Sequence, residues 1–194
     1  MEVKSIIRKV LEILQNVDLY SRITSNDATI TLTSEEILER DIIIDCINLV
    51  QQNIATNYFN LIDTFQINNT YDVLPYSKIS TLQIFNIISV KNTKNEVLKY
   101  TLKPSGIVTN KCDIVIKYAF FPKDVTINDN ITTFPIGVSE RIFVYGVVSE
   151  YMFVKGNIDE YNVWQNKFET EIENVKNNAK KICHSANLKR RRWE

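Results

Sequence analysis

The sequence predicts an α+β fold: a four-helix bundle of two N-terminal and two C-terminal helices, with a central antiparallel β-rich insertion and an extended C-terminal tail. Three observations lead to this prediction. Apolar residues recur at helical spacing near both ends of the 194-residue chain, β-branched and aromatic residues dominate its middle, and its last residues are basic and aromatic. The expected domains are 1–58 with 134–187 for the helical bundle, 59–133 for the β-rich insertion and 188–194 for a docking tail.

The N-terminal part is expected to contain two helices joined by a loop. Helical spacing of apolar residues predicts the first helix over 2–16, and the polar, threonine-rich stretch 18–32 predicts the loop. Thr33 or Ser34 is the expected cap of a second helix that ends near residue 57. Its expected apolar, core-facing side consists of Leu38, Ile42, Cys46, Leu49 and Ile54.

The middle of the chain changes to the composition of strands. Five short segments are rich in Ile, Val, Tyr, Phe and Thr, and asparagine, proline and glycine separate them. The expected strands cover 59–67, 71–74, 82–90, 96–102 and 113–120. Because the connections are short, we expect an antiparallel sheet or a small sandwich.

Two further helices are expected after the insertion. Residues 135–156 are apolar on most of the helix circumference, which predicts a helix buried on nearly all sides, ended by Gly156 and Asn157. A second helix from residue 159 to about 186 carries an apolar stripe at i, i+3, i+4 spacing. The stripe consists of Tyr161, Trp164, Phe168, Ile172, Val175, Ala179 and Ile182.

Composition excludes several classes of protein. Lysine plus arginine and aspartate plus glutamate each number 23, so no overall basic charge favours nucleic-acid binding. The apolar runs are too short to span a membrane, and the first residues do not form a secretory leader. Three widely spaced cysteines, Cys46, Cys112 and Cys183, fit reduced thiols. We expect a soluble intracellular protein or a particle component.

Catalytic, cofactor-binding and metal-binding motifs are not expected. His184 is the single histidine, and next to Cys183 it supplies at most half of a zinc site. A metal-dependent enzyme that uses this pair stays open as an alternative, and it predicts stoichiometric zinc. The glycines are too few and too scattered for a phosphate-binding loop. The sequence therefore favours a non-enzymatic protein without cofactors.

The C-terminal end combines charge with a large apolar side chain. Lys189 to Arg192 could contact phosphates, which leaves a nucleic-acid-binding module as the main alternative function. Trp193 favours protein docking, because tryptophan and arginine are enriched in interface hot spots. The predicted docking residues are Leu188, Lys189, Arg190, Arg191, Arg192 and Trp193.

Several segments together resemble a family of viral proteins. In the C-terminal half they are Phe134-Pro135-Ile136, the run 141–151, Lys155-Gly156-Asn157, the run 164–169 that begins with Trp164, and Arg191-Arg192-Trp193; in the insertion they are the runs 82–90 and 113–122. The C-terminal half resembles that of head–tail adaptor proteins of tailed bacteriophages, the connector or tail-tubular rings that sit under the portal. The two runs in the insertion resemble strands of the β insert in such proteins. The asparagine- and isoleucine-rich composition suits a podovirus of the crAss-like group.

The resemblance implies a dodecameric ring at the portal vertex of the virion, made in the host cytoplasm. The ring would join the portal to other tail or ring proteins, line the channel through which genomic DNA passes without sequence specificity, and have no enzymatic activity. A stopper or tail-completion protein would share the same plan. For side-to-side contacts between copies we expect an acidic face with Glu35, Glu36 and Glu39 to meet a basic face with Lys176, Lys180 and Lys181.

Overall fold

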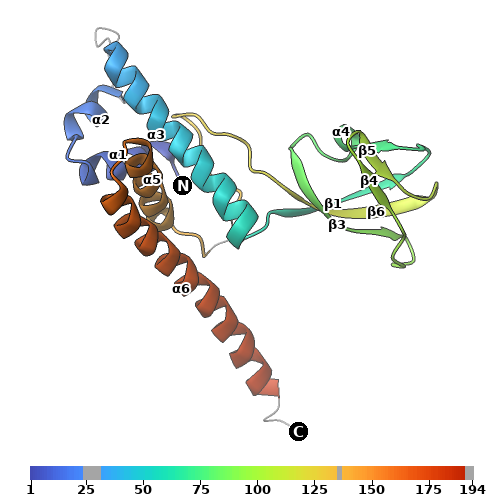
Figure 1. Ribbon diagram of the computed structural model, residues 1–194. Helices are drawn as coiled ribbons and strands as arrows, with labels where there is room; N and C mark the ends of the chain where they lie inside the picture. Colours follow the sequence, from blue (N-terminus) through green and yellow to red (C-terminus); the bar gives the residue numbers. More distant parts are fainter. Residues whose placement is uncertain (24–31, 135–136, 191–194) are drawn as a thin grey trace. The chain divides into compact units, whose positions relative to one another are not determined.

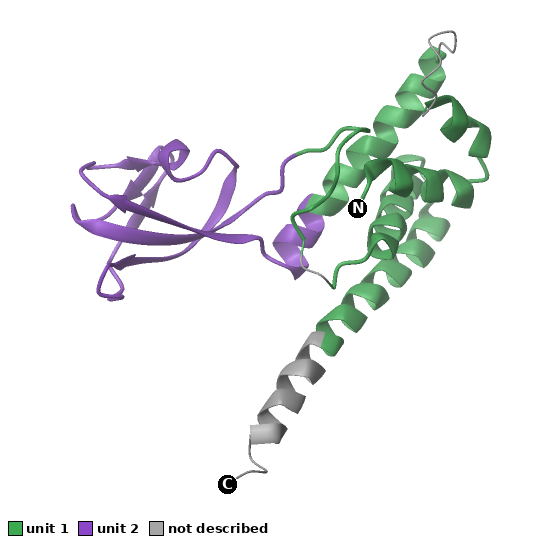
Figure 2. Cartoon of the chain, turned by 180° about the vertical axis from the view of Figure 1, so that it is seen from behind, with its two compact units in different colours: residues 1–51, 124–194 green, residues 52–123 purple. Residues whose placement is uncertain are grey.

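The chain forms two compact units that are interleaved in sequence. The computed structural model describes residues 1–23, 32–134 and 137–190, with side chains described as far as residue 178. Residues 1–51 and 124–194 make up one unit, called the helical unit below, and residues 52–123 make up the other, called the β unit (Figures 1 and 2). The α+β class predicted from the sequence is confirmed.

The segment that follows the β unit belongs to the helical unit, although the sequence assigns it to the insertion. Its backbone pairs with the N-terminus: the Ile131 amide donates to the Met1 carbonyl at 2.8 Å, and the Val3 amide donates to the Asp129 carbonyl at 3.2 Å. The Asn48 side chain also holds it, accepting from the Val125 amide at 2.8 Å and donating to the Val125 carbonyl at 3.2 Å. These pairs set the boundary near residue 124.

The first two helices are α1, Val3–Ile13, and α2, Val17–Ile23. Gln15 ends α1 with a positive φ of 58°. The next amide, of Asn16, then bonds back to the Leu11 carbonyl at 2.8 Å, as in a Schellman motif. The predicted loop over 18–32 is wrong at its start, because α2 occupies its first residues. A buried Leu19 anchors this short helix.

Helix α3, Ser34–Asn53, begins with a capping box. The Thr33 amide donates to a Glu36 carboxylate oxygen at 2.8 Å, and the Glu36 amide donates to Thr33 Oγ1 at 3.3 Å. Thr33 is therefore the cap. The regular helix ends earlier than predicted and passes into one wide π-helical turn, Ile54–Tyr58.

Helices α5, Glu140–Val154, and α6, Ile158–Arg190, form an antiparallel hairpin (Figure 1). Gly156 adopts φ 79° in the turn, which confirms the predicted end of α5. The helix is buried on nearly all sides, as predicted, with nine of its fifteen residues inside the helical unit. A Cβ placed on Gly146 would lie 2.9 Å from Val50 Cγ1 of α3 and 3.0 Å from Phe168 Cε2 of α6, so this glycine allows three helices to meet.

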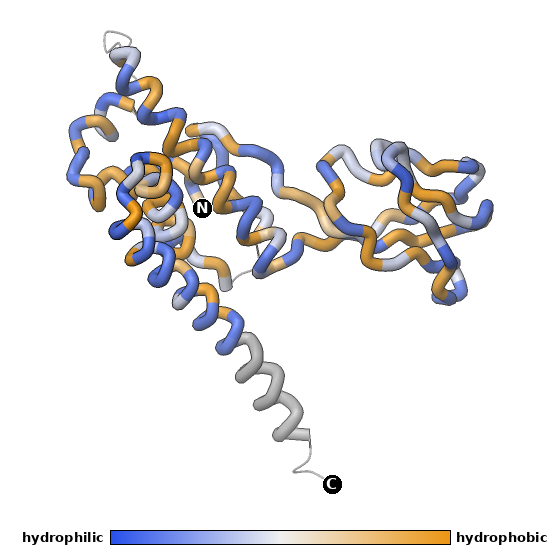
Figure 3. The backbone as a smooth tube through the Cα atoms, viewed as in Figure 1, coloured by the Kyte–Doolittle hydropathy of each residue, from blue (hydrophilic) through white to orange (hydrophobic). Residues whose placement is uncertain are grey.

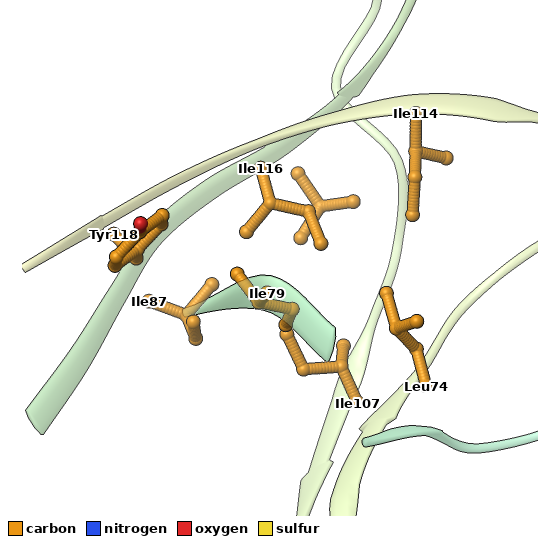
Figure 4. Packing of buried hydrophobic residues seen from close by; sticks show 8 residues of the cluster. Leu74, Ile79, Ile87, Ile107, Ile114, Ile116 and Tyr118 are labelled. Atoms are coloured by element: carbon orange, nitrogen blue, oxygen red, sulfur yellow. The ribbon is translucent and has the colours of Figure 1, made fainter. Parts of the chain in front are cut away.

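The β unit contains two three-stranded antiparallel sheets, in the order β1-β6-β3 and β2-β5-β4. The strands are β1 Ile62–Asn68, β2 Leu74–Pro75, β3 Ile84–Asn92, β4 Thr101–Lys103, β5 Gly106–Val108 and β6 Asp113–Phe120, and a one-turn helix α4, Tyr76–Ile79, follows β2. Their shared core consists of Leu74, Ile79, Ile87, Val90, Ile107, Ile114, Ile116 and Tyr118, seven of which Figure 4 labels. Strand β5 lies between the expected strands 96–102 and 113–120, where no strand was predicted.

Gly106 makes β5 possible. Its φ is +156°, and a Cβ there would lie 2.1 Å from the Leu74 carbonyl oxygen. Only glycine lets the two backbones approach so closely. Within the described residues, the helices lack a stretch long and apolar enough to cross a membrane.

Candidate interaction surfaces

Groups suited to catalysis are scarce in the described part of the chain. It holds no cluster of three or more His, Cys, Asp or Glu side chains that could bind a metal ion. Burial, with the nearby carboxylates Glu150, Asp45 and Glu39, raises the pKa of the Cys46 thiol to about 12. Because the thiolate is the reactive form, Cys46 is a structural thiol. Cys183 and His184 lie outside the described side chains.

One face of α3 is apolar and open to solvent. The predicted core-facing side of this helix is confirmed at Cys46 and Ile54, which are buried, and wrong at two positions, since Leu38 is 62% exposed and Leu49 is 51% exposed. Besides Cys46, the buried side chains of α3 are Ile43, Ile47, Val50 and Gln51, which were not predicted to face the core. Hydrophobic residues recur along the whole helix (Figure 3), so the sequence pattern alone did not identify the inward face. The contact of Val50 with α5 at Gly146 identifies it.

The exposed face has a regular spacing. Leu38, Ile42, Asp45 and Leu49 follow one another at intervals of four, three and four residues, which places them on one side of the helix. We call these four residues the α3 stripe. Asp41 and Asp45 are exposed, and Ile42 is half-buried. The stripe thus presents three aliphatic side chains with carboxylates beside and among them.

Two of the three acids predicted to meet another subunit have partners within their own chain. Arg22 Nη1 lies 2.5 Å from Glu36 Oε1. The hydrogen bond from the Thr33 amide, and then the Arg22 charge, lower the pKa of Glu36. Glu39 accepts a hydrogen bond from the Tyr151 hydroxyl and pairs with Lys155 Nζ at 2.7 Å.

Glu39 therefore joins α3 to the end of α5. Burial, and then the Glu39 carboxylate, raise the pKa of Tyr151. Of the three predicted acids, Glu35 is the exposed one.

The predicted basic partners are only partly described. Lys176 is half-buried on α6, whereas Lys180, Lys181 and the docking residues Leu188 to Trp193 lie outside the described side chains. Their sequence is distinctive. Residues 176–192 contain seven lysines and arginines and no acid.

A second surface, on the α5–α6 hairpin, was not predicted. The Tyr145 and Trp164 rings lie 5.6 Å apart, with the Arg141 guanidinium 5.2 Å from the Tyr145 ring and Lys167 Nζ 3.8 Å from the Trp164 ring. A depression of about 320 Å³ lies beside them, and Glu171 on its wall pairs with Arg141 at 3.2 Å. The i, i+4 and i, i+3 spacings of these pairs were the signal available in the sequence.

The β unit has a larger depression of about 430 Å³ between β1, α4 and β6. Asp63, Lys78 and Ser80 bring polar groups to it, and Tyr118 contributes a buried ring. The Tyr118 hydroxyl lies 3.4 Å from Asp63 Oδ2, and burial raises the pKa of Tyr118. Asp63 and Lys78 are both exposed at this depression.

Comparison with known proteins does not assign the chain. Its sequence matches no protein-family model, and no curated protein matches it significantly. The surfaces described above therefore carry the functional argument.

Proposed function

We propose that the protein is a structural component of a bacteriophage virion, a head–tail connector ring that joins the portal to the tail and surrounds the DNA exit channel. The observation that carries this proposal is the exposed α3 stripe. Leu38 and Leu49 are each more than half exposed on one helix face, beside carboxylates. Apolar faces of this kind are typical of surfaces that pack against another protein.

The pattern of charge supports a ring. α3 carries five acids and one base, whereas residues 176–192 carry bases only, so the chain has unlike surfaces that attract each other. A contact between two different faces of identical subunits is heterologous, and repeated contacts of this kind close into a ring or extend into a filament. In this proposal the ring lies at the portal vertex of the virion, after synthesis in the host cytoplasm.

The long last helix supports attachment to a second protein. α6 has 33 residues and its hairpin partner α5 has 15, so the C-terminal half of α6 extends past the hairpin. We propose that residues 188–194 at its end anchor the ring on the portal or on a neighbouring ring. Deletion of 188–194 should abolish attachment to purified portal rings, and unchanged attachment would refute this part of the proposal.

A four-helix bundle of α1, α3, α5 and α6 is the framework that we propose for these surfaces. Lys9 of α1 pairs with Glu140 of α5 at 2.6 Å, and Gly146 of α5 meets both Val50 of α3 and Phe168 of α6. Short α2 joins this framework through the Arg22–Glu36 pair.

Electron microscopy of the protein with its particle tests the function. The proposal requires a discrete ring of density between the capsid vertex and the tail, and density elsewhere would overturn it. The run of seven bases without an acid favours one alternative, a nucleic-acid-binding module. That alternative predicts a monomer that binds DNA tightly in low salt and loses affinity steeply as salt rises.

A further inference from the structure

The α3 stripe has the character of half of a helix–helix interface. Leu38, Ile42, Asp45 and Leu49 repeat at four-three-four spacing, which matches the seam that one helix presents to another. Much of the rest of α3 is engaged within the chain, because its opposite face is buried in the helical unit and Glu36 and Glu39 have partners in the same chain. The stripe is therefore the part of α3 left for a partner.

The stripe selects a basic partner. Glu35, Asp41 and Asp45 are exposed on and beside it. Arg40, which pairs with Asp41 at 2.7 Å, is the one base within α3. A helix that covered the stripe would need apolar residues at the same spacing and bases at its margins.

The chain contains a segment with this composition. Between residues 175 and 186, the apolar residues Val175, Ala179, Ile182 and Ala186 are spaced by four, three and four, as in the α3 stripe. Val175 lies against Gly137 of its own chain, so the residues proposed for a partner are Ala179, Ile182 and Ala186. Residues 176–192 supply seven bases and no acid. We call 175–192 the basic segment.

The basic segment must come from a different copy. Lys155, at the hairpin turn, contacts Glu39, and Gly146 lies between Val50 and Phe168, so the inward face of α3 lies level with the first part of the α5–α6 hairpin, and the stripe is on the other, exposed face. α6 then continues unbroken to Arg190. At a rise of 1.5 Å per residue, position 180 lies about 18 Å farther along the axis than Phe168. A continuous helix cannot bring this segment back to the stripe of its own chain.

We propose that the α3 stripe of one copy binds the basic segment of a second copy, in a head-to-tail contact that each copy can make once on each side. This inference rests on the proposed ring, and it names the two surfaces that would join neighbouring subunits. In this proposal the α3 residues at the contact between subunits are Leu38, Ile42 and Leu49, and no longer Glu36 and Glu39.

Disulfide trapping of the full-length chain tests the pairing directly. The native Cys183 lies within the basic segment, so Leu38→Cys, Ile42→Cys and Leu49→Cys are made one at a time in a Cys112→Ser background. At high protein concentration and under mild oxidation, at least one of these variants should form disulfide-linked multimers. Adding Cys183→Ser should remove them.

The matched control is Val163→Cys. Val163 is 53% exposed, as open as Leu49, but it lies on α6 away from the stripe. It should yield at least tenfold fewer linked multimers. Equal linking from Val163→Cys, or no Cys183-dependent linking from any stripe position, would overturn the inference.

Charge reversal supplies a second measurement. Asp41→Lys with Asp45→Lys, or Lys180→Glu with Lys181→Glu, should weaken self-association about tenfold in sedimentation experiments, and a mixture of the two reversed chains should associate again. Glu169→Lys with Glu173→Lys, an equal charge change at exposed positions of α6, should leave association unchanged. Failure of the mixture to recover association would refute the pairing.

These results are separable from the test of function. Self-association through the stripe without a ring on the particle would refute the connector function and keep the contact. A ring on the particle whose subunits do not link through Cys183 would keep the function and refute the contact.

Discussion

Replacing Gly146 with alanine tests whether α3, α5 and α6 meet as described. In an exposed helix, this change stabilises by about 1 kcal/mol, because alanine has the higher helix propensity. At Gly146 the new Cβ would lie 2.9 Å from Val50 Cγ1 and 3.0 Å from Phe168 Cε2. Val50 is β-branched and Phe168 is fully buried, so neither side chain can move aside easily.

The magnitude follows from two opposing effects. Overpacking of a tight core costs about 1–3 kcal/mol, and the gain in propensity offsets about 1 kcal/mol of this cost. We expect a net loss of up to about 2 kcal/mol in the free energy of unfolding. In a chain of this length the melting temperature should fall by up to about 8 °C. The assay is thermal and urea unfolding followed by helical circular dichroism.

A double-mutant cycle shows whether Val50 is the cause. Val50→Ala removes the methyl groups nearest to the new Cβ, so Gly146→Ala should be less harmful in that background, with a coupling energy of about 1 kcal/mol. Asn166→Ala, at an exposed position of α6, serves as a control and should stay within about 0.5 kcal/mol of wild type. A Gly146→Ala protein more stable than wild type would refute the three-helix contact.

Four further predictions concern single groups. Gly106→Ala should destabilise the β unit by roughly 2–4 kcal/mol in urea unfolding, since its Cβ would meet the Leu74 carbonyl and its φ is unfavourable. Burial raises the pKa of Glu150, so the folded state holds this proton more tightly; stability should fall as the pH rises through the raised pKa, and Glu150→Gln should remove this dependence in melting curves measured above pH 4.5. Cys46 should react with a thiol reagent only as fast as the helical unit opens, because its thiol is buried with a pKa of about 12. Glu39→Ala should cost about 1–3 kcal/mol of stability, whereas Glu35→Ala should be nearly neutral, because only Glu39 binds Tyr151 and Lys155.

The sequence predicted the elements whose signals are local. The cap at Thr33, the turn at Gly156 and the all-round burial of α5 follow from short patterns, and the structure confirms them. The strand at Gly106 was not predicted, because the close approach of the Leu74 backbone depends on pairing with a distant strand. Helix α2 was missed because its seven residues bury only Leu19, too little for a periodic pattern.

The face of α3 shows a different limit. Ile42, Ile43 and Ile44 are consecutive, so apolar residues lie on more than one side of the helix and periodicity permits two choices. Which side of α3 faces inward depends on the contact between Val50 and α5 at Gly146. This is a tertiary contact, so the local sequence does not reveal it. The predicted subunit interface failed for a related reason. Glu36 pairs with Arg22 and Glu39 pairs with Lys155, and neither contact can be recognised from the local sequence.

The α3 stripe is exposed within one copy, and the basic segment carries an excess of bases. The two features complement each other. Leu38 and Leu49 gain from burial in any apolar contact, so they do not choose a partner. Asp41 and Asp45 make the stripe selective for a basic partner, because an acidic partner would repel these two carboxylates and leave them partly desolvated. The basic segment alone would bind any anion, DNA included. Only a partner that has both the apolar spacing and the bases satisfies the stripe completely, and this chain carries such a segment in every copy.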